Sequence, residues 1–96
     1  MSVALNITKA YAQVAMLKQQ SAAASHSARV LSAYKSELLQ SWAGIEVSYL
    51  IKTIDAQIHA CKKLSEESDS LSHDIARAIE DILREESAED TETLSG

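Results

Sequence analysis

The sequence predicts an all-α protein, an antiparallel hairpin of two long helices. Each half carries a heptad repeat, the 96 residues include no proline, and Trp42-Ala43-Gly44 lies almost at the middle. A glycine supplies the backbone freedom that a chain reversal requires, and the indole gives the corner a large group to bury. We expect one helix over about 5–40, a turn over 41–45 and a second helix over about 46–85.

The first arm has a stripe whose residues recur at alternating steps of four and three, the spacing of a heptad. The stripe consists of Val3, Ile7, Ala10, Val14, Leu17, Ser21, Ala24, Ala28, Leu31, Lys35, Leu38 and Trp42. Only Ser21 and Lys35 are polar residues in this otherwise apolar stripe. No large apolar side chain stands between Leu17 and Val30. Symmetric pairing about the corner would place Ala24 near Cys61 or Lys62. We call the segment of small side chains around Ala24 the waist. It either admits a crossing partner helix or is a weakly packed segment.

The second arm has a similar stripe, with one shortened step from Cys61 to Leu64. It consists of Val47, Ile51, Ile54, Ile58, Cys61, Leu64, Ser68, Leu71, Ile75, Ala78 and Ile82, and Ile79 widens its far end. A shortened step is a stammer, which locally overwinds a supercoil. From Glu85 onward the sequence is acidic and polar, which predicts a hairpin domain over 1–86 and a disordered tail over 87–96.

The composition favours association with another helical surface. Hydrophobic residues make up 46% of the chain, but fifteen are alanine and only four residues are aromatic. The single cysteine cannot form an internal disulfide, and small domains with thin cores depend on partners. Further apolar residues flank the two stripes: Tyr11, Met16, Val30, Tyr34, Leu39, Leu50, Ile79 and Leu83.

Such a widened face is typical of a four-helix bundle, formed with a second copy or with another protein, although these residues could also be singly exposed hydrophobes. The helical seam expected to support partner binding comprises Val14, Leu17, Ala24, Leu31, Leu38, Ile51, Ile54, Ile58, Leu71, Ile75 and Ile79.

The charge is divided between the two arms. Residues 1–42 carry four basic and one acidic side chains, whereas residues 43–96 carry five basic and thirteen acidic ones. This division favours pairing of the arms and docking of the acidic arm on a basic helix, or it reflects ordinary surface solvation. The net charge of −5 argues against binding to nucleic acid or anionic lipid. The sequence shows neither a secretory signal nor a membrane-spanning stretch, so we expect a cytoplasmic protein.

The sequence offers little for catalysis. His59 and Cys61 point to different helix faces, and Cys61 lies in the apolar stripe with no basic group to activate it. Glu66, Asp69 and His73 share one face, but such spacing is common by chance on a polar surface. We expect no cofactor, no metal and no enzymatic activity.

Two long heptad arms joined at Trp42-x-Gly44, over a length near one hundred, resemble the WXG, or early-secreted-antigen, family of type VII secretion systems. The resemblance covers nearly the whole chain. It implies a hairpin with Trp42 and Gly44 at its turn, paired as a homodimer or heterodimer into a four-helix bundle. Members of that family are secreted substrates, adaptors for larger substrates, or both.

One departure from the family refines the expectation. The family's export signal is an aromatic residue followed within one helical turn by Asp or Glu, but no aromatic follows Tyr49, and Ile82-x-x-x-Glu86 is a poor match. The chain is therefore more similar to the helical companions of LXG toxins. We expect a non-catalytic adaptor that binds the helical N-terminal region of a larger exported effector and readies it for export, either staying in the cytoplasm or leaving with its partner. The alternatives are a self-sufficient secreted homodimer and a cytosolic coiled-coil scaffold.

Overall fold

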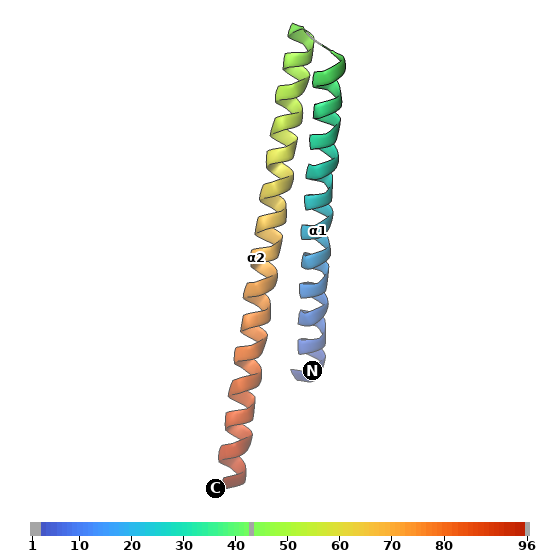
Figure 1. The fold of residues 1–96 in the computed structure, drawn as a ribbon. Coiled ribbons are helices and arrows are strands. Elements are labelled where there is room, and N and C mark those ends of the chain that lie inside the picture. Colours follow the sequence, from blue (N-terminus) through green and yellow to red (C-terminus); the bar gives the residue numbers. More distant parts are fainter. Residues whose placement is uncertain (1–2, 43, 96) are drawn as a thin grey trace.

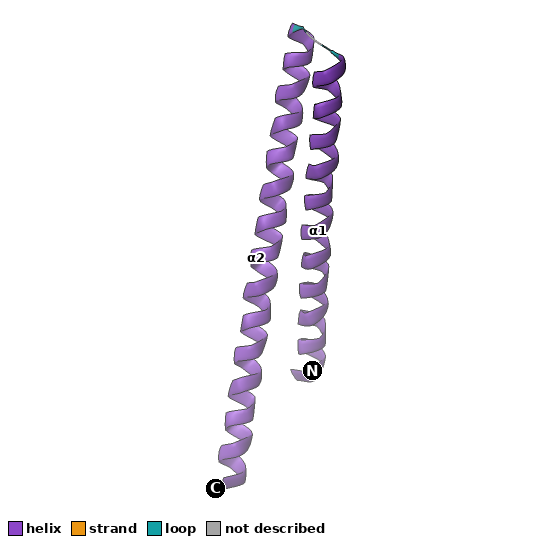
Figure 2. Ribbon diagram, viewed as in Figure 1, coloured by secondary structure: helices purple, strands orange, loops and turns teal. Residues whose placement is uncertain are grey.

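The computed structural model describes the backbone of residues 3–42 and 44–95 and the side chains of residues 6–42 and 44–87. Over this part the chain forms two long helices, α1 (Val3–Ser41) and α2 (Ile45–Ser95), and no strand. They run antiparallel and side by side, with the corner at one end (Figure 1), and all the regular structure is helical (Figure 2). The result is a rod of 78 × 17 × 16 Å. The predicted all-α hairpin is confirmed.

The corner depends on Gly44. Its φ of +139° lies in the region that residues with a side chain rarely adopt, while a Cβ built there would meet nothing within 4 Å. Backbone conformation rather than space therefore selects glycine here. The Trp42 amide still donates to the Leu38 carbonyl at 2.9 Å, and the Ser48 amide donates to the Gly44 carbonyl at 3.2 Å. Helical hydrogen bonding therefore reaches Trp42 at the end of α1 and begins again at Gly44.

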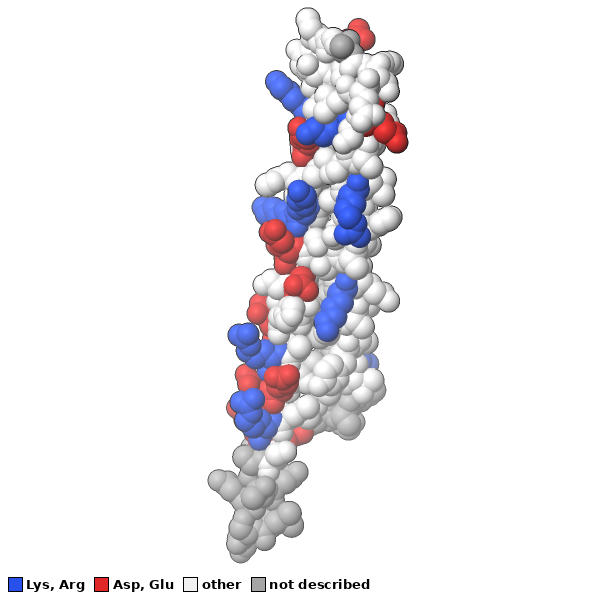
Figure 3. Space-filling model, in the orientation of Figure 1, with Lys and Arg blue, Asp and Glu red and all other residues white. Residues whose placement is uncertain are grey.

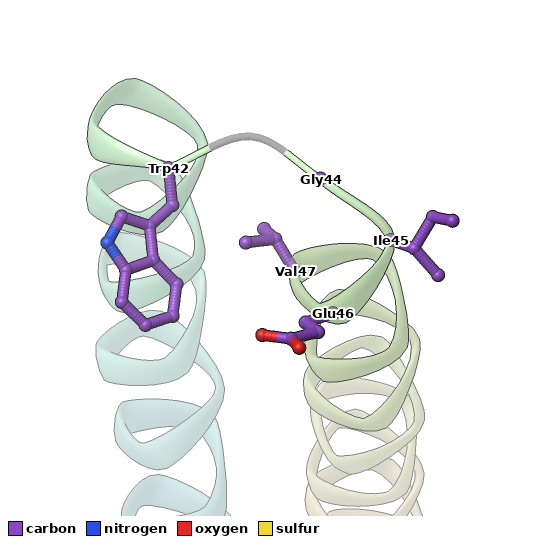
Figure 4. Close-up of a pocket in the computed structure, with 5 residues that line it drawn as sticks. All are labelled: Trp42, Gly44, Ile45, Glu46 and Val47. Atoms are coloured by element: carbon purple, nitrogen blue, oxygen red, sulfur yellow. The ribbon is translucent and has the colours of Figure 1, made fainter.

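The predicted stripe of the first arm faces α2. From Ile7 to Leu38 every member of the stripe is buried or half-buried, and most residues between them are exposed. Trp42 is the exception, because its side chain is 61% exposed. The expectation that the indole fills the corner is wrong. α1 ends at Ser41, and the indole lies against the outside of the last turn while Val47 points toward α1 (Figure 4).

The second arm follows an uninterrupted heptad, so the predicted stammer is wrong. Beyond Cys61 the residues turned toward α1 are Ser65, Ser68, Ser72, Ile75 and Ile79. Leu64 and Leu71, which the sequence placed in the stripe, are 42% and 48% exposed. Of these serines, Ser65 lies opposite Ser21, where two small side chains let the helices approach closely. A buried serine hydroxyl can also donate its hydrogen bond to a backbone carbonyl of its own helix, as Ser72 does to the Asp69 carbonyl at 2.6 Å.

A hydrogen bond between the helices defines their register. Ser21 Oγ donates to the Ser65 carbonyl at 2.8 Å and lies 3.1 Å from Ser65 Oγ. This is the symmetric register that predicts Ala24 across from Cys61 or Lys62. On the corner side of the bond lies the apolar cluster of the hairpin, formed by Ala28, Ile54 and Ile58 with Leu31, Leu38, Leu50 and Cys61 packed against it. The largest apolar contacts therefore lie in the half nearest the corner.

Lys35 is explained by an ion pair with the opposite helix. Its Nζ lies 2.6 Å from Asp55 Oδ1, with both side chains partly exposed. Among the described residues, the other ion pairs join groups within α2. A partly exposed pair contributes only about 0–1 kcal/mol, so the opposite charges of the arms assist the pairing but do not drive it.

α2 is longer than the sequence predicted. It continues to Ser95, whereas an end near residue 85 and a disordered tail over 87–96 were expected. No glycine or proline interrupts it, and the alanine and glutamate of this stretch favour helix. Counting outward equally from Ser21 and Ser65 places Val3 level with Leu83. The remainder of α2 therefore extends beyond the start of α1 (Figure 1).

We predict that Ile54→Ala destabilises the hairpin by about 2–5 kcal/mol, because it removes a side chain from the cluster and leaves a cavity. Ile54 is 3% exposed. Ile45→Ala is a matched control, since Ile45 is 77% exposed and its truncation should change the free energy of unfolding by less than about 0.5 kcal/mol. Urea unfolding followed by far-UV circular dichroism measures both. Equal losses would contradict the packing described.

Candidate docking surface

The two flanks of the hairpin, on either side of the seam, differ in chemistry. On one flank a shallow depression is lined by Ser25, Ala28, Arg29, Ser32 and Lys62. The Lys35–Asp55 ion pair joins the helices one heptad closer to the corner along α2. We call this side the charged flank, and it carries Lys18, Arg29, Asp55, Lys62 and Asp69. It is solvated and crossed by charges of both signs.

The opposite flank is apolar. Residues two apart on a helix point about 200° apart, so Val30 and Tyr34 face away from Ser32, and Leu64 faces away from Lys62. Met16 lies two heptads before Val30, and Leu71 lies one heptad after Leu64. We call this side the apolar flank and define it by these five residues, each of which is between 42% and 60% exposed.

The apolar flank is long and, on α1, free of charge. Between Lys9 and Glu37 the charged residues of α1 are Lys18, Arg29 and Lys35, none of which faces this flank. The uncharged stretch is therefore roughly 40 Å long at ~1.5 Å per residue. An uncharged surface of this length matches a partner helix rather than a small ligand. On the face of the rod drawn in Figure 3, by contrast, basic side chains lie over α1, and side chains of both signs gather over α2.

The exposure of Leu64 and Leu71 was not predicted from the sequence. If both leucines lay in the seam, α2 would contribute few large apolar side chains to the apolar flank. With serines in the seam, both leucines join Met16, Val30 and Tyr34 on one side. The available signal was Ser65 and Ser72, which directly follow the two leucines and match in size the small residues of the first arm.

Most of the predicted seam residues pack inside the hairpin. Five of them are buried, namely Val14, Ala24, Ile54, Ile58 and Ile79. Five more are half-buried, namely Leu17, Leu31, Leu38, Ile51 and Ile75. Only Leu71 is exposed. The first ten stabilise the pairing of α1 with α2, and their role in binding a partner stays a prediction. A partner that leaves the hairpin closed meets the apolar flank instead.

The corner forms a second apolar surface. Leu39, Trp42, Ile45 and Tyr49 are all more than half exposed there. A shallow depression is lined by Trp42, Gly44, Ile45, Glu46 and Val47 (Figure 4). Ile45 points away from α1, whereas Trp42 lies along it, so these side chains surround the corner and do not converge on one point. The corner can extend a contact made along the flank, but it lacks the enclosure of a ligand site.

The candidate metal-ligating groups of the sequence are dispersed among the described residues. No group of three metal-ligating side chains comes together there. His73 Nδ1 lies 2.9 Å from the Asp69 carbonyl oxygen and 3.6 Å from Asp69 Oδ2, which is a local contact one turn apart. Cys61 is half-buried against the apolar cluster, and His59 is exposed.

Within the part of the chain that the structure describes, neither helix has a stretch apolar and long enough to cross a bilayer. Comparison of the chain with protein-family models, with curated proteins and with solved structures gives no match. The functional argument therefore depends on the surface of the hairpin.

We predict that the fluorescence of Trp42, the only tryptophan, resembles that of a solvated indole and is readily quenched by acrylamide, because the side chain is largely exposed. Trp42→Ala should change the free energy of unfolding by less than about 1 kcal/mol. Quenching titrations and urea unfolding check the two parts. A shielded indole together with a large loss of stability would show that Trp42 is buried.

Proposed function

We propose that this chain is a non-catalytic adaptor that binds a helical region of a larger protein along its apolar flank. The observation that supports the proposal is the contrast between the flanks, one with five large exposed apolar side chains and the other with charges of both signs. Helices that present an apolar face on one side complete a four-helix bundle when a second pair packs against them. The closed hairpin thus supplies two of the four helices of such a bundle, and the partner supplies the other two.

The magnitude of the binding energy favours a long partner over a short peptide. Full burial of a large apolar side chain contributes about 1.5–3 kcal/mol, and the flank side chains are about half exposed, so each supplies roughly 1 kcal/mol. Five of them supply about 5 kcal/mol, while association costs an estimated ~4–15 kcal/mol. A partner must therefore cover the whole flank and reach the corner, as a helical hairpin can.

More narrowly, we propose that the partner is the helical N-terminal region of an exported effector in a type VII secretion system. Trp42-x-Gly44 at the junction of two heptad arms supports this assignment, through its resemblance to the WXG family. The absence of an aromatic residue after Tyr49 supports the adaptor role over self-sufficient export. In this role the closed hairpin docks on its effector in the cytoplasm and readies it for export.

The experiment compares two tyrosines of equal exposure on opposite flanks. Tyr34 and Tyr11 are both 47% exposed on α1, but Tyr34 faces the apolar flank and Tyr11 lies three heptads before Ser32, on the charged flank. The chain is co-expressed with the helical N-terminal region of an LXG-type effector, and complex formation is measured by light scattering. We predict that Tyr34→Asp weakens binding at least tenfold, because a carboxylate is buried in the bundle core.

Tyr11→Asp should leave the affinity unchanged within about threefold, since its carboxylate stays in solvent. Far-UV circular dichroism of both variants checks that the hairpin persists. Equal effects of the two substitutions would contradict docking on the apolar flank, and failure of the wild-type chain to bind would contradict the effector assignment.

A further inference from the structure

We propose that the depression on the charged flank binds a single phosphate group, carried by inorganic phosphate or by a small phosphate monoester. The depression has a volume of about 290 Å³ and is lined by Ser25, Ala28, Arg29, Ser32 and Lys62. The first four residues belong to α1 and Lys62 belongs to α2. Two cations and two hydroxyl groups, supplied by both helices, therefore border one hollow, and none of the lining residues is acidic.

Both cations lack a carboxylate partner. Among the described residues, neither Arg29 nor Lys62 takes part in an ion pair. Asp55, one heptad before Lys62 on α2, is paired with Lys35 instead. Glu66, one turn after Lys62, does not lie within ion-pair distance of it. In a chain of net charge −5, two uncompensated cations thus face one depression, and an anion bound there would interact with both.

The hydrogen-bond donors around the depression suit a phosphate group. Arg29 Nη1 donates to Ser25 Oγ at 3.1 Å, a bond that holds the guanidinium against α1. A guanidinium presents its N–H groups as a planar fork that matches phosphate oxygens, so one internal bond leaves most of the fork for a ligand. In the described part of the chain the Ser32 hydroxyl makes no hydrogen bond. Lys62 adds a compact positive charge from the opposite helix.

The charges along the flank limit the ligand to one phosphate group. Asp55 and Asp69 stand one heptad to either side of Lys62, each about 10 Å away at ~1.5 Å per residue. A nucleic acid or an anionic bilayer lying along the rod would bring further phosphates against these carboxylates. A single phosphate meets only the cations. Because the depression is shallow, the organic part of a monoester would extend into solvent.

The phosphate site and the docking surface lie on opposite flanks, so one can be occupied without blocking the other. The proposal does not depend on the proposed function, and the purified chain alone tests it. Since Arg29 and Lys62 come from different helices, a ligand that contacts both requires the closed hairpin.

The experiment is an NMR titration of the isotope-labelled full chain with inorganic phosphate, at an ionic strength held constant with chloride. Amide shifts should saturate and gather around residues 25–32 of α1 and Lys62 of α2, with a millimolar dissociation constant because both cations are exposed. Methyl phosphate should bind within about threefold of inorganic phosphate if the site accepts monoesters, and its failure to bind would assign the site to free phosphate. Vesicles of phosphatidylglycerol should not bind, and vesicle binding that requires Lys62 would contradict the restriction to a single phosphate.

Substitutions of adjacent lysines separate a site from a general effect of salt. We predict that Lys62→Gln and Arg29→Gln each raise the dissociation constant of phosphate roughly fivefold, because each removes one of the two charges. Lys63→Gln is the matched control, since Lys63 points about 100° away from Lys62 on α2 and lies 4.0 Å from Glu67. It should leave the constant within about twofold of wild type. All three side chains are exposed, so circular dichroism should show an unchanged helix content. Shifts that do not saturate, or equal effects of the three substitutions, would overturn the proposal.

Discussion

The register between α1 and α2 is the constraint on which the rest of the structure depends. The Ser21–Ser65 hydrogen bond lies at the waist, where both helices offer small side chains. An uninterrupted heptad on each helix meets there without local overwinding. Once this register is set, the position of every other side chain relative to the seam follows from the helical repeat.

The same register divides the hairpin into unequal halves. Toward the corner, isoleucines and leucines form an apolar cluster around Ala28. Toward the open end, serines replace them at Ser65, Ser68 and Ser72, and the seam gains less from the hydrophobic effect. A small domain with so thin a core has limited stability by itself, so covering the apolar flank would stabilise the fold while burying exposed leucines. In the proposed function, binding and folding are coupled through this surface.

The exposed side chains of the apolar flank pose a physical problem that the proposed partner would solve. The apolar flank exposes large side chains along α1 and α2, and helices of another hairpin can cover them. In the proposed complex the charged flank stays in solvent, which limits association to one side. The corner, with Trp42 and Ile45 on its surface, lies at one end of the flank and extends it.

The prediction of the first arm succeeded because its information is local. Heptad spacing from Ile7 to Leu38 specifies one face of one helix, and Gly44 specifies a reversal that other residues adopt only with strain. The exposure of the Trp42 side chain could not be predicted in this way, since burial of an indole at this position depends on how the chain leaves the last turn of α1. The end of α2 was misjudged because acidic composition was weighed above helix propensity.

The sequence by itself determined two long helices, a glycine corner and the buried face of α1, because helical periodicity and backbone sterics act within a few residues. Only the tertiary structure decided which face of α2 meets α1. Leu64 and Ser65 are neighbours, and either begins a plausible stripe, but the packed helices continue the heptad from Cys61 and bring Ser65 against Ser21. That choice turned the leucines outward and created the apolar flank.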